Sequence, residues 1–366
     1  MASRTVQTAV PIASSLNGIS KPEPDFLILH DFPPPEVERT WRDYLHKLEC
    51  PSHYDSPEFF REPYLFGTNR FAVLAFDGNS VVGVLTGLHK DGQVLSGLQS
   101  RPQVSTTDDP KAPDSLARGL LEEAGSKKLI TVYSWRSLPL PSLEHYDFHA
   151  RELEGDVVLD LQPGPEALFK ELHASRRKNV RHGLRAGVEV FRAKTEEEAK
   201  SFYEVNVGWH HTKRKKIKSP QIPWDAFLER FRQDGNFAYM LARYSGKVIA
   251  GITLRVFPGG LVEFSNHSSL DDFLYLKPNE VLQWKCIEWA CQQGFRRCSL
   301  GGAHTFHRRF GGRVIPILRY RLDRTFLRRH DRHEATLDLM RNGFRKLPLA
   351  IQNEVRRMTG RTEPGP

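Results

Sequence analysis

One structural pattern occurs twice in this chain of 366 residues. An apolar run at 71–76, an Asp-Gly turn and a second apolar run at 81–85 predict a β-hairpin. The apolar runs at 237–244 and 248–254, joined by Ser-Gly-Lys, predict the same hairpin again. A repeated unit predicts two hydrophobic cores, which also suits the length of the chain.

The elements that follow each hairpin support the duplication. Gly83 and Gly251 lie in the second strand of each hairpin, 168 positions apart. A strand, a helix and another strand come next in both copies. These elements are expected at 93–98, 115–124 and 129–135 in the first copy, and at 261–267, 279–293 and 296–300 in the second. We therefore expect two copies of one α/β unit with a period near 168 residues.

The repeat divides the chain into five segments. Residues 166–186 have helical spacing, although the part from Ser175 to Arg181 is too basic to bury. Thr195 and Glu198 have the spacing of a capping box and predict the start of another helix. The segments expected are a flexible N-terminal stretch at 1–24, a first unit at 25–162, a connecting helix at 163–186, a second unit at 187–326, and amphipathic helices with a tail at 327–366.

Composition and missing motifs exclude several classes of protein. Hydrophobic residues at 39% exclude a wholly disordered chain. There is no signal-peptide pattern and no apolar run near the ~20 residues that span a membrane, so we expect a cytoplasmic protein. Four cysteines without zinc-ligand spacing predict reduced thiols and no metal site. The motifs of hydrolases, P-loop NTPases, zinc proteases and dinucleotide-binding proteins are absent.

The net charge of +9 is unevenly distributed. The first half is acidic, and two basic blocks at 176–218 and 296–361 flank a nearly neutral stretch. An anionic partner should therefore bind to the second half. A nucleic-acid-binding or other anion-binding protein without catalytic activity is one alternative, but the sequence signatures of RNA- and DNA-binding motifs are absent. We expect no specific nucleic acid.

A helix that begins in the second copy is a candidate anion site. Its first N–H groups have no partner within the helix, and Lys277 adds positive charge. A phosphate-bearing donor would suit this place. The residues expected to bind it are Tyr275, Leu276, Lys277, Pro278 and Asn279.

Five motifs in the second half carry a family resemblance. They are Ser175-Arg-Arg-Lys-Asn-Val-Arg181 with Gly187-Val-Glu-Val, the hairpin with Gly246 and Ala250-Gly251, Leu276-Lys-Pro-Asn-Glu-Val-Leu282, Trp289-Ala290 with Gly294-Phe-Arg-Arg, and Phe306-His-Arg-Arg-Phe-Gly311. In this order they resemble the FemAB-like group of the GNAT superfamily, also described as having a BioF2-like acetyltransferase domain. The resemblance covers 155–325 well and 26–150 weakly. It implies an α/β fold of tandem GNAT-like units, with two mixed β-sheets flanked by helices and a C-terminal helical extension.

The resemblance implies transfer of an acyl or aminoacyl group to an amine by direct attack. His307 stands where the family usually has a lysine, so His307 or Arg308 should stabilise the charge that develops on the reacting carbonyl. Asp272 or Glu263 should accept the proton. The substrate-binding residues expected are Arg177, Lys178, Lys213, Arg214, Gly301, His304 and Phe306.

Two departures from the family pattern leave the donor open. The Gly-containing pyrophosphate loop of ordinary GNAT enzymes is replaced by 275–279, and the helical insertion of tRNA-using members has no room between 224 and 236. We expect no tightly bound cofactor and an acyl-CoA, such as acetyl-CoA, as co-substrate, with an aminoacyl-tRNA as the alternative. The acceptor expected is an amine of a small molecule, or of a cell-envelope or polysaccharide precursor such as an amino sugar or a peptidoglycan or exopolysaccharide precursor. Peripheral membrane contact is compatible with this.

Overall fold

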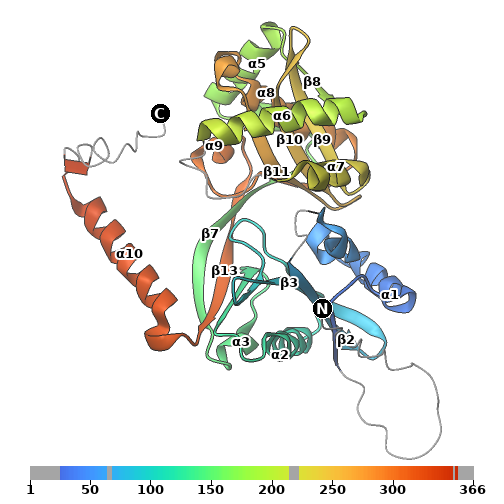
Figure 1. Cartoon of the computed structure of the whole chain (residues 1–366), viewed down its shortest axis with the longest axis vertical. Coiled ribbons are helices and arrows are strands. Elements are labelled where there is room, and N and C mark those ends of the chain that lie inside the picture. Colours follow the sequence, from blue (N-terminus) through green and yellow to red (C-terminus); the bar gives the residue numbers. More distant parts are fainter. Residues whose placement is uncertain (1–24, 64–67, 214–221, 349–350, 353–366) are drawn as a thin grey trace, which may run out of the picture.

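The computed structural model describes residues 25–63, 68–213, 222–348 and 351–352. Two α/β units lie one above the other, and two long strands, β7 (His149–Asp160) and β13 (Arg313–Asp323), run from one unit into the other (Figure 1). This arrangement confirms the predicted α/β class with tandem units. The predicted N-terminal segment 1–24 lies outside the described residues.

The first unit follows its predicted pattern closely. Its hairpin is β2 (Asn69–Asp77) with β3 (Ser80–Lys90), and its helix α2 (Ala112–Ala124) packs on that hairpin. A short strand, β5 (Val104–Thr106), lies between the stretches 93–98 and 115–124 that were predicted as a strand and a helix. The other elements are β1 (Phe26–Leu29), α1 (Pro35–Leu45), η1 (His53–Asp55), η2 (Pro57–Arg61), β4 (Gln93–Ser96), β6 (Leu129–Trp135) and α3 (Pro141–Glu144).

The second unit repeats this order of elements. Its hairpin is β9 (Phe237–Tyr244) with β10 (Lys247–Val256), followed by β11 (Leu261–Ser269), the helix α8 (Pro278–Gln292) and β12 (Arg297–Ser299). The remaining elements are α4 (Gly164–Glu171), α5 (Ala174–Arg185), β8 (Glu189–Arg192), α6 (Glu196–Lys213), α7 (Trp224–Arg232), η4 (Asp271–Leu276), α9 (Thr305–Arg308), η5 (Phe326–Arg328) and α10 (Arg329–Lys346).

The two predicted sheets are joined into one. Among the described residues the strands form a 13-stranded sheet in the order β1-β2-β3-β4-β6-β13-β7-β12-β11-β10-β9-β8, with β5 beside β3. β6 of the first unit pairs with β13, and β12 of the second unit pairs with β7. Each unit therefore receives the long strand that follows the other unit in the chain, and the centre of the sheet is a strand exchange.

The duplication holds, but the two marker glycines are not equivalent. Gly83 faces Leu116 of α2, whereas Gly251 faces Phe202 of α6. By their order in the chain, α2 corresponds to α8 and not to α6. The two glycines thus lie on opposite faces of their sheets, so the period of 168 is one residue out of register in this strand.

The predicted connecting helix is two helices. α4 and α5 are separated at Leu172 and His173, whose ψ angles of 142° and 143° are those of an extended backbone. The predicted exposure of the basic stretch is wrong at Arg176, which is only 8% exposed and is paired with Glu280 of α8. The capping box predicted at Thr195 is confirmed by the hydrogen bonds that it exchanges with Glu198.

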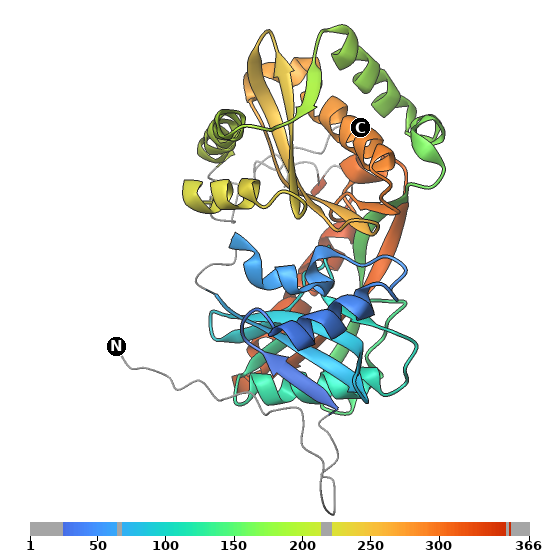
Figure 2. The same cartoon turned by 90° about the vertical axis from the view of Figure 1, so that its right-hand side faces the viewer.

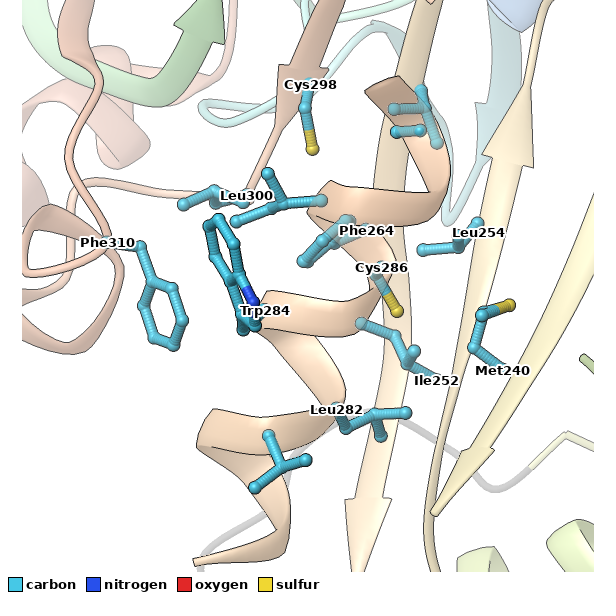
Figure 3. Packing of buried hydrophobic residues seen from close by; sticks show 14 of the residues in the cluster. Met240, Ile252, Leu254, Phe264, Leu282, Trp284, Cys286, Cys298, Leu300 and Phe310 are labelled. Atoms are coloured by element: carbon cyan, nitrogen blue, oxygen red, sulfur yellow. The ribbon is translucent and has the colours of Figure 1, made fainter. Parts of the chain in front are cut away.

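A large apolar core lies between the sheet of the second unit and α8 (Figure 3). Trp284, Phe264 and Leu300 pack together there, and Cys286 and Cys298 lie among them. Burial raises the pKa of both thiols well above its ordinary value. These two cysteines are free thiols that pack in the core.

The segment with η1 and η2, drawn in blue, lies between the two units (Figure 2). Charged side chains join the units here. Glu62 is fully buried, and its carboxylate accepts hydrogen bonds from Arg230 of α7 and Arg255 of β10 at 3.0 and 2.8 Å. Burial alone would raise the pKa of Glu62, but the two guanidinium groups hold it far below its usual range. This buried network fixes the first unit against α7 and β10 of the second unit.

The C-terminal extension is a helix that projects from the exchanged strands (Figure 1). Glu334 of α10 binds Arg319 and Arg321 of β13, and Asp338 binds Arg151 of β7. The second predicted amphipathic helix falls mostly outside the described residues. Within the part of the chain that the structure describes, no helix has the length and apolarity needed to cross a membrane.

Candidate active site

Strands β11 and β12 separate in the middle of the second unit. They pair in parallel only from Leu261 to Glu263, opposite Arg297 to Ser299. β12 then ends, while β11 continues along β10 as far as Ser269, past a β-bulge near Asn266. Beyond Ser299, therefore, the side chains and backbone of β11 face the segment that leads into α9 instead of a paired strand.

The N-terminus of α8 lies at the end of this diverging pair. Lys277 precedes the helix in a left-handed conformation (φ 57°, ψ 43°), and Pro278 occupies the first turn. The side chain of Lys277 makes no capping hydrogen bond. The N–H groups of Asn279 and Glu280 are in the first turn, where the helix itself supplies no acceptor, so the helix dipole and these donors favour a negative group here.

A carboxylate and two α5 side chains lie against this helix start. Arg176 and Asn179 donate to Oε1 of Glu280 at 2.7 and 2.9 Å. The guanidinium carbon of Arg176 also lies 4.2 Å from the centre of the Phe306 ring. Arg176 thus connects the α8 N-terminus to the α9 segment, and it neutralises the carboxylate nearest to the candidate anion site.

Two histidines come together between β11 and α9. Burial lowers the pKa of His267 on β11 to about 4, with the neighbouring His307 as a further cause, and the side chain of Asn279 acts in the opposite direction. Nε2 of His267 and Oδ1 of Asn279 are buried without a well-formed hydrogen-bond partner in the described residues. Buried polar atoms of this kind are rare in proteins and mark places where water or a ligand binds.

His307 is held in one tautomer. Its Nδ1 lies 3.1 Å from the carbonyl oxygen of Gly302, and a carbonyl can only accept, so Nδ1 carries the proton when the ring is neutral. Burial lowers the pKa of His307. This shift favours the neutral ring, in which Nε2 can accept a hydrogen bond or a proton. The role in charge stabilisation that the resemblance implies for His307 or Arg308 stays a prediction.

Acidic groups gather on the opposite face of the same strands. Glu263 of β11 is 3% exposed and accepts from Nε of Arg101 at 3.3 Å, while its Oε2 has no partner in the described chain. Burial raises its pKa. Asp156 of β7 is completely buried and shares a hydrogen bond with the Ser299 hydroxyl. Arg101 comes from the first unit, and its guanidinium carbon lies 5.3 Å from the centre of the Tyr54 ring of the same unit.

The structure brings together only part of the predicted site. His307, the backbone of Gly301 and Gly302, Phe306 and Asn279 lie around the diverging strands with Lys277, while Glu263 lies on the other face of β11. Asp272 and Tyr275 are exposed on η4, and Leu276 is buried in the core. His304 is exposed, with its ring centre 5.8 Å from that of His307.

The predicted basic substrate residues have other neighbours. Arg308 donates to the carbonyl of Ala303 and pairs with Glu154 of β7. Arg177 donates to the carbonyls of Lys170 and Leu172 and so closes the C-terminal end of α4. Lys178 is exposed, about half a turn around α5 from the face that packs on α8. Lys213 ends α6, and Arg214 lies outside the described residues.

Four residues of the site were missed from the sequence: Asp156, Ser299, Arg101 and His267. Asp156 and Arg101 belong to the first unit and reach the site only through the strand exchange and the segment before β5. No local pattern marks such residues. His267 could have been found, because a histidine ends an otherwise strand-like run just before the candidate anion loop.

Two hollows of the described surface lie elsewhere. One of about 650 Å³ in the first unit is lined by residues that include His30, His89 and Glu123, and one of about 450 Å³ lies beside Tyr203 and Trp224. Neither contains a predicted site residue. The candidate site lies at the diverging strands, because His267, His307 and the N-terminus of α8 come together there.

Comparisons with known proteins agree with this geometry. Residues 173–309 match the family model described as an acetyltransferase (GNAT) domain. FemX has a similar fold, with a TM-score of 0.57 at 14% identity over 76% of this chain and 95% of FemX. No curated protein sequence matches the chain.

Two further solved structures share the fold. The C-terminal domain of a putative lysylphosphatidylglycerol synthetase from Agrobacterium fabrum gives a TM-score of 0.56 at 14% identity, over 83% of this chain and 95% of that one. A tandem GNAT protein from the clavulanic acid biosynthesis pathway gives a TM-score of 0.52 at 13% identity, over 82% of this chain and 98% of that protein. At such identities the likeness establishes the fold, two GNAT-like units in tandem.

Proposed function

Because the chain carries an acetyltransferase (GNAT) domain and is an acyltransferase, we propose that it transfers an acyl group from an acyl-CoA to an amine by direct attack. The observation that carries this proposal is the divergence of β11 and β12 beside the N-terminus of α8. An acyl thioester can lie along the unpaired edge of β11, with its phosphates at the helix N-terminus.

The donor phosphates would bind to the α8 N-terminus. The N–H groups of Asn279 and Glu280, together with the ammonium of Lys277, would contact them. Arg176 supports this, because it neutralises Glu280 and leaves the helix start without a competing negative charge. These residues fit a phosphate-bearing co-substrate that binds and dissociates in each turnover.

The reaction needs a neutral amine and hydrogen-bond donors at the developing oxyanion. The amine nitrogen forms a bond to the acyl carbon and loses a proton, the C–S bond of the thioester breaks, and the sulfur takes up a proton and leaves as the thiol of CoA. Backbone N–H groups at the bulge of β11 and in the Gly301–Gly302 turn would stabilise the oxyanion. Nε2 of His307 would contact the reacting group as a neutral acceptor. Much of the acceleration would come from positioning.

The amine would approach from the face that carries Glu263, where Arg101 of the first unit binds this carboxylate and lies beside Tyr54. The acceptor would therefore contact both units. A small-molecule amine or an amine of a cell-envelope or polysaccharide precursor fits this description. One protein of similar fold is the C-terminal domain of a putative lysylphosphatidylglycerol synthetase. An aminoacyl donor is therefore tested beside the acyl-CoAs.

The test is a panel of acyl-CoAs with a mixed pool of amines, read by mass spectrometry, alongside aminoacyl-tRNA as donor. We expect free CoA and an N-acylated amine in equal amounts. Lys277→Ala should raise the Kd for CoA about five- to tenfold, because one cation at the phosphates is lost. Lys285→Ala, two turns along α8, is the matched control. Product from aminoacyl-tRNA alone would overturn the acyl-CoA proposal.

A further inference from the structure

Asp156 is a first-unit residue that lies in the sheet of the second unit. β7 carries it there: Val158 of β7 pairs with Ser299 of β12, and Ser299 pairs with Glu263 of β11. Residues two apart on a strand share a face, and so do directly paired residues. Asp156, Ser299 and Glu263 therefore line one face of three adjacent strands, at the last position where β11 and β12 are paired.

The surroundings of Asp156 contain few charges. The Ser299 hydroxyl contacts its Oδ2, and Glu263 and Arg101 are the charged side chains near it. On β13, the strand on the other side of β7, the residue that pairs with Asp156 is the apolar Ile315. Oδ1 of Asp156 makes no well-formed hydrogen bond in the described part of the chain, although the side chain is completely buried and the backbone N–H of Val157 acts on the carboxylate. One oxygen is thus available for another group at the diverging strands.

The two carboxyl groups differ in what holds their charge. Glu263 binds Arg101 directly, and Arg255 also lowers its pKa, whereas Asp156 has a hydroxyl group as its partner. Burial raises the pKa of Asp156 to about 7, with the negative charge of Glu263 as a further cause, and the Ser299 hydrogen bond acts in the opposite direction. A group that titrates near 7 is well matched to accept a proton at neutral pH.

We propose that Asp156, brought into the second unit by the strand exchange, takes up the proton that the attacking amine loses. As nitrogen bonds to the acyl carbon, its N–H proton passes to a carboxylate oxygen of Asp156. The C–S electrons leave with the sulfur, and the proton held by Asp156 then passes to the thiolate, directly or through water, which releases free CoA thiol and regenerates the carboxylate. The proposal rests on the proposed function, and it makes the first unit part of the reacting centre.

The test is the pH dependence of kcat/KM for the full chain, with the acyl-CoA and amine found in the panel. Asp156→Asn should lower kcat/KM about 100-fold and remove the acidic limb near pH 7, while the Kd for CoA stays unchanged. Asp160→Asn, on an exposed residue of the same strand, is the matched control and should keep the wild-type profile.

Two further variants separate proton transfer from a structural role. Glu263→Gln removes a negative charge that raises the pKa of Asp156, so the acidic limb should move to lower pH. Ser299→Ala removes the hydrogen bond that lowers this pKa, so the limb should move to higher pH. A merely structural role would not shift the limb in opposite directions. These variants also serve if Asp156→Asn does not fold.

The outcomes distinguish the two proposals. A wild-type protein that transfers no acyl group from any acyl-CoA overturns the proposed function. An active wild-type protein whose Asp156→Asn variant keeps full kcat/KM overturns the role of Asp156. So does an acidic limb that stays in place in both Glu263→Gln and Ser299→Ala, or one that disappears in His307→Ala but persists in Asp156→Asn, since the base would then be His307.

Discussion

Arg176 donates a 2.7 Å hydrogen bond to the carboxylate of Glu280, across the contact between α5 and the first turn of α8. Both side chains are about nine-tenths buried. A buried ion pair is costly to break from one side, because the remaining charge keeps its desolvation penalty without its partner. The pair therefore ties the helix before the second unit to the proposed donor site.

Replacing Arg176 should weaken both folding and donor binding. Arg176→Met keeps most of the volume and leaves Glu280 charged at the α8 N-terminus, so we expect a loss of about 3 kcal/mol in the free energy of unfolding and weaker CoA binding. Urea unfolding and calorimetric titration with CoA measure the two effects. The double variant Arg176→Met with Glu280→Gln should regain much of the stability and much of the affinity for CoA. Unchanged CoA affinity in the single variant would contradict this role.

The buried network between the units should dominate their docking. Glu62→Gln leaves Arg230 and Arg255 without the carboxylate between them, so we expect a loss of about 3–5 kcal/mol. Denaturant unfolding measures it, with Glu229→Gln on the exposed side of α7 as control. If the two variants unfolded at the same denaturant concentration, Glu62 would not hold the units together.

Two buried histidines make stability depend on pH. Burial lowers the pKa of His53 and of His267 to about 4, whereas an unfolded histidine titrates near 6.5. Between these values the unfolded chain binds more protons, so stability should be full above about pH 6.5 and fall as the pH drops towards 4. Thermal melts across this window check the sign. His53→Gln should flatten part of the slope, and an unchanged slope would contradict the burial of a neutral His53.

Gly251 is a packing requirement. A Cβ at this position would lie 2.2 Å from the ring of Phe202, so Gly251→Ala should destabilise the protein by about 1–3 kcal/mol. Gly343→Ala in α10 meets open space and should be neutral or slightly stabilising. Adding Phe202→Leu to Gly251→Ala should restore part of the loss, as thermal unfolding would show. A harmless Gly251→Ala would mean that α6 can move off the sheet.

Local patterns predicted the elements but not their exchange. The hairpins β2–β3 and β9–β10, and the helices α2 and α8, follow from apolar spacing and turn residues within short stretches. β7 and β13 were not predicted as strands. The first half of β7 has exposed or half-buried charged residues, and β13 contains Pro316. These strands are stabilised mainly by pairing with each other, over a separation in sequence that no local pattern reveals.

The site, too, was predicted only where its residues are close in the sequence. The helix start at Lys277 was predicted, because its residues and charge are contiguous in the sequence, and His307 was singled out by the family resemblance. The setting of Glu263 was not predicted, since its neighbours Arg101 and Asp156 come from the first unit. Arg176 was predicted to be exposed because its neighbours are basic, and only the position of Glu280 explains its burial.

The most direct test of the proposed function is a single assay of the wild-type chain with a pool of amines and an acyl-CoA that carries an isotope label in its acyl group. Mass spectrometry should find the label bound to nitrogen in the product, with one equivalent of free CoA, and His307→Ala should reduce the yield. If the wild-type chain bound CoA yet formed no N-acylated product with any acyl-CoA, the central claim would be contradicted.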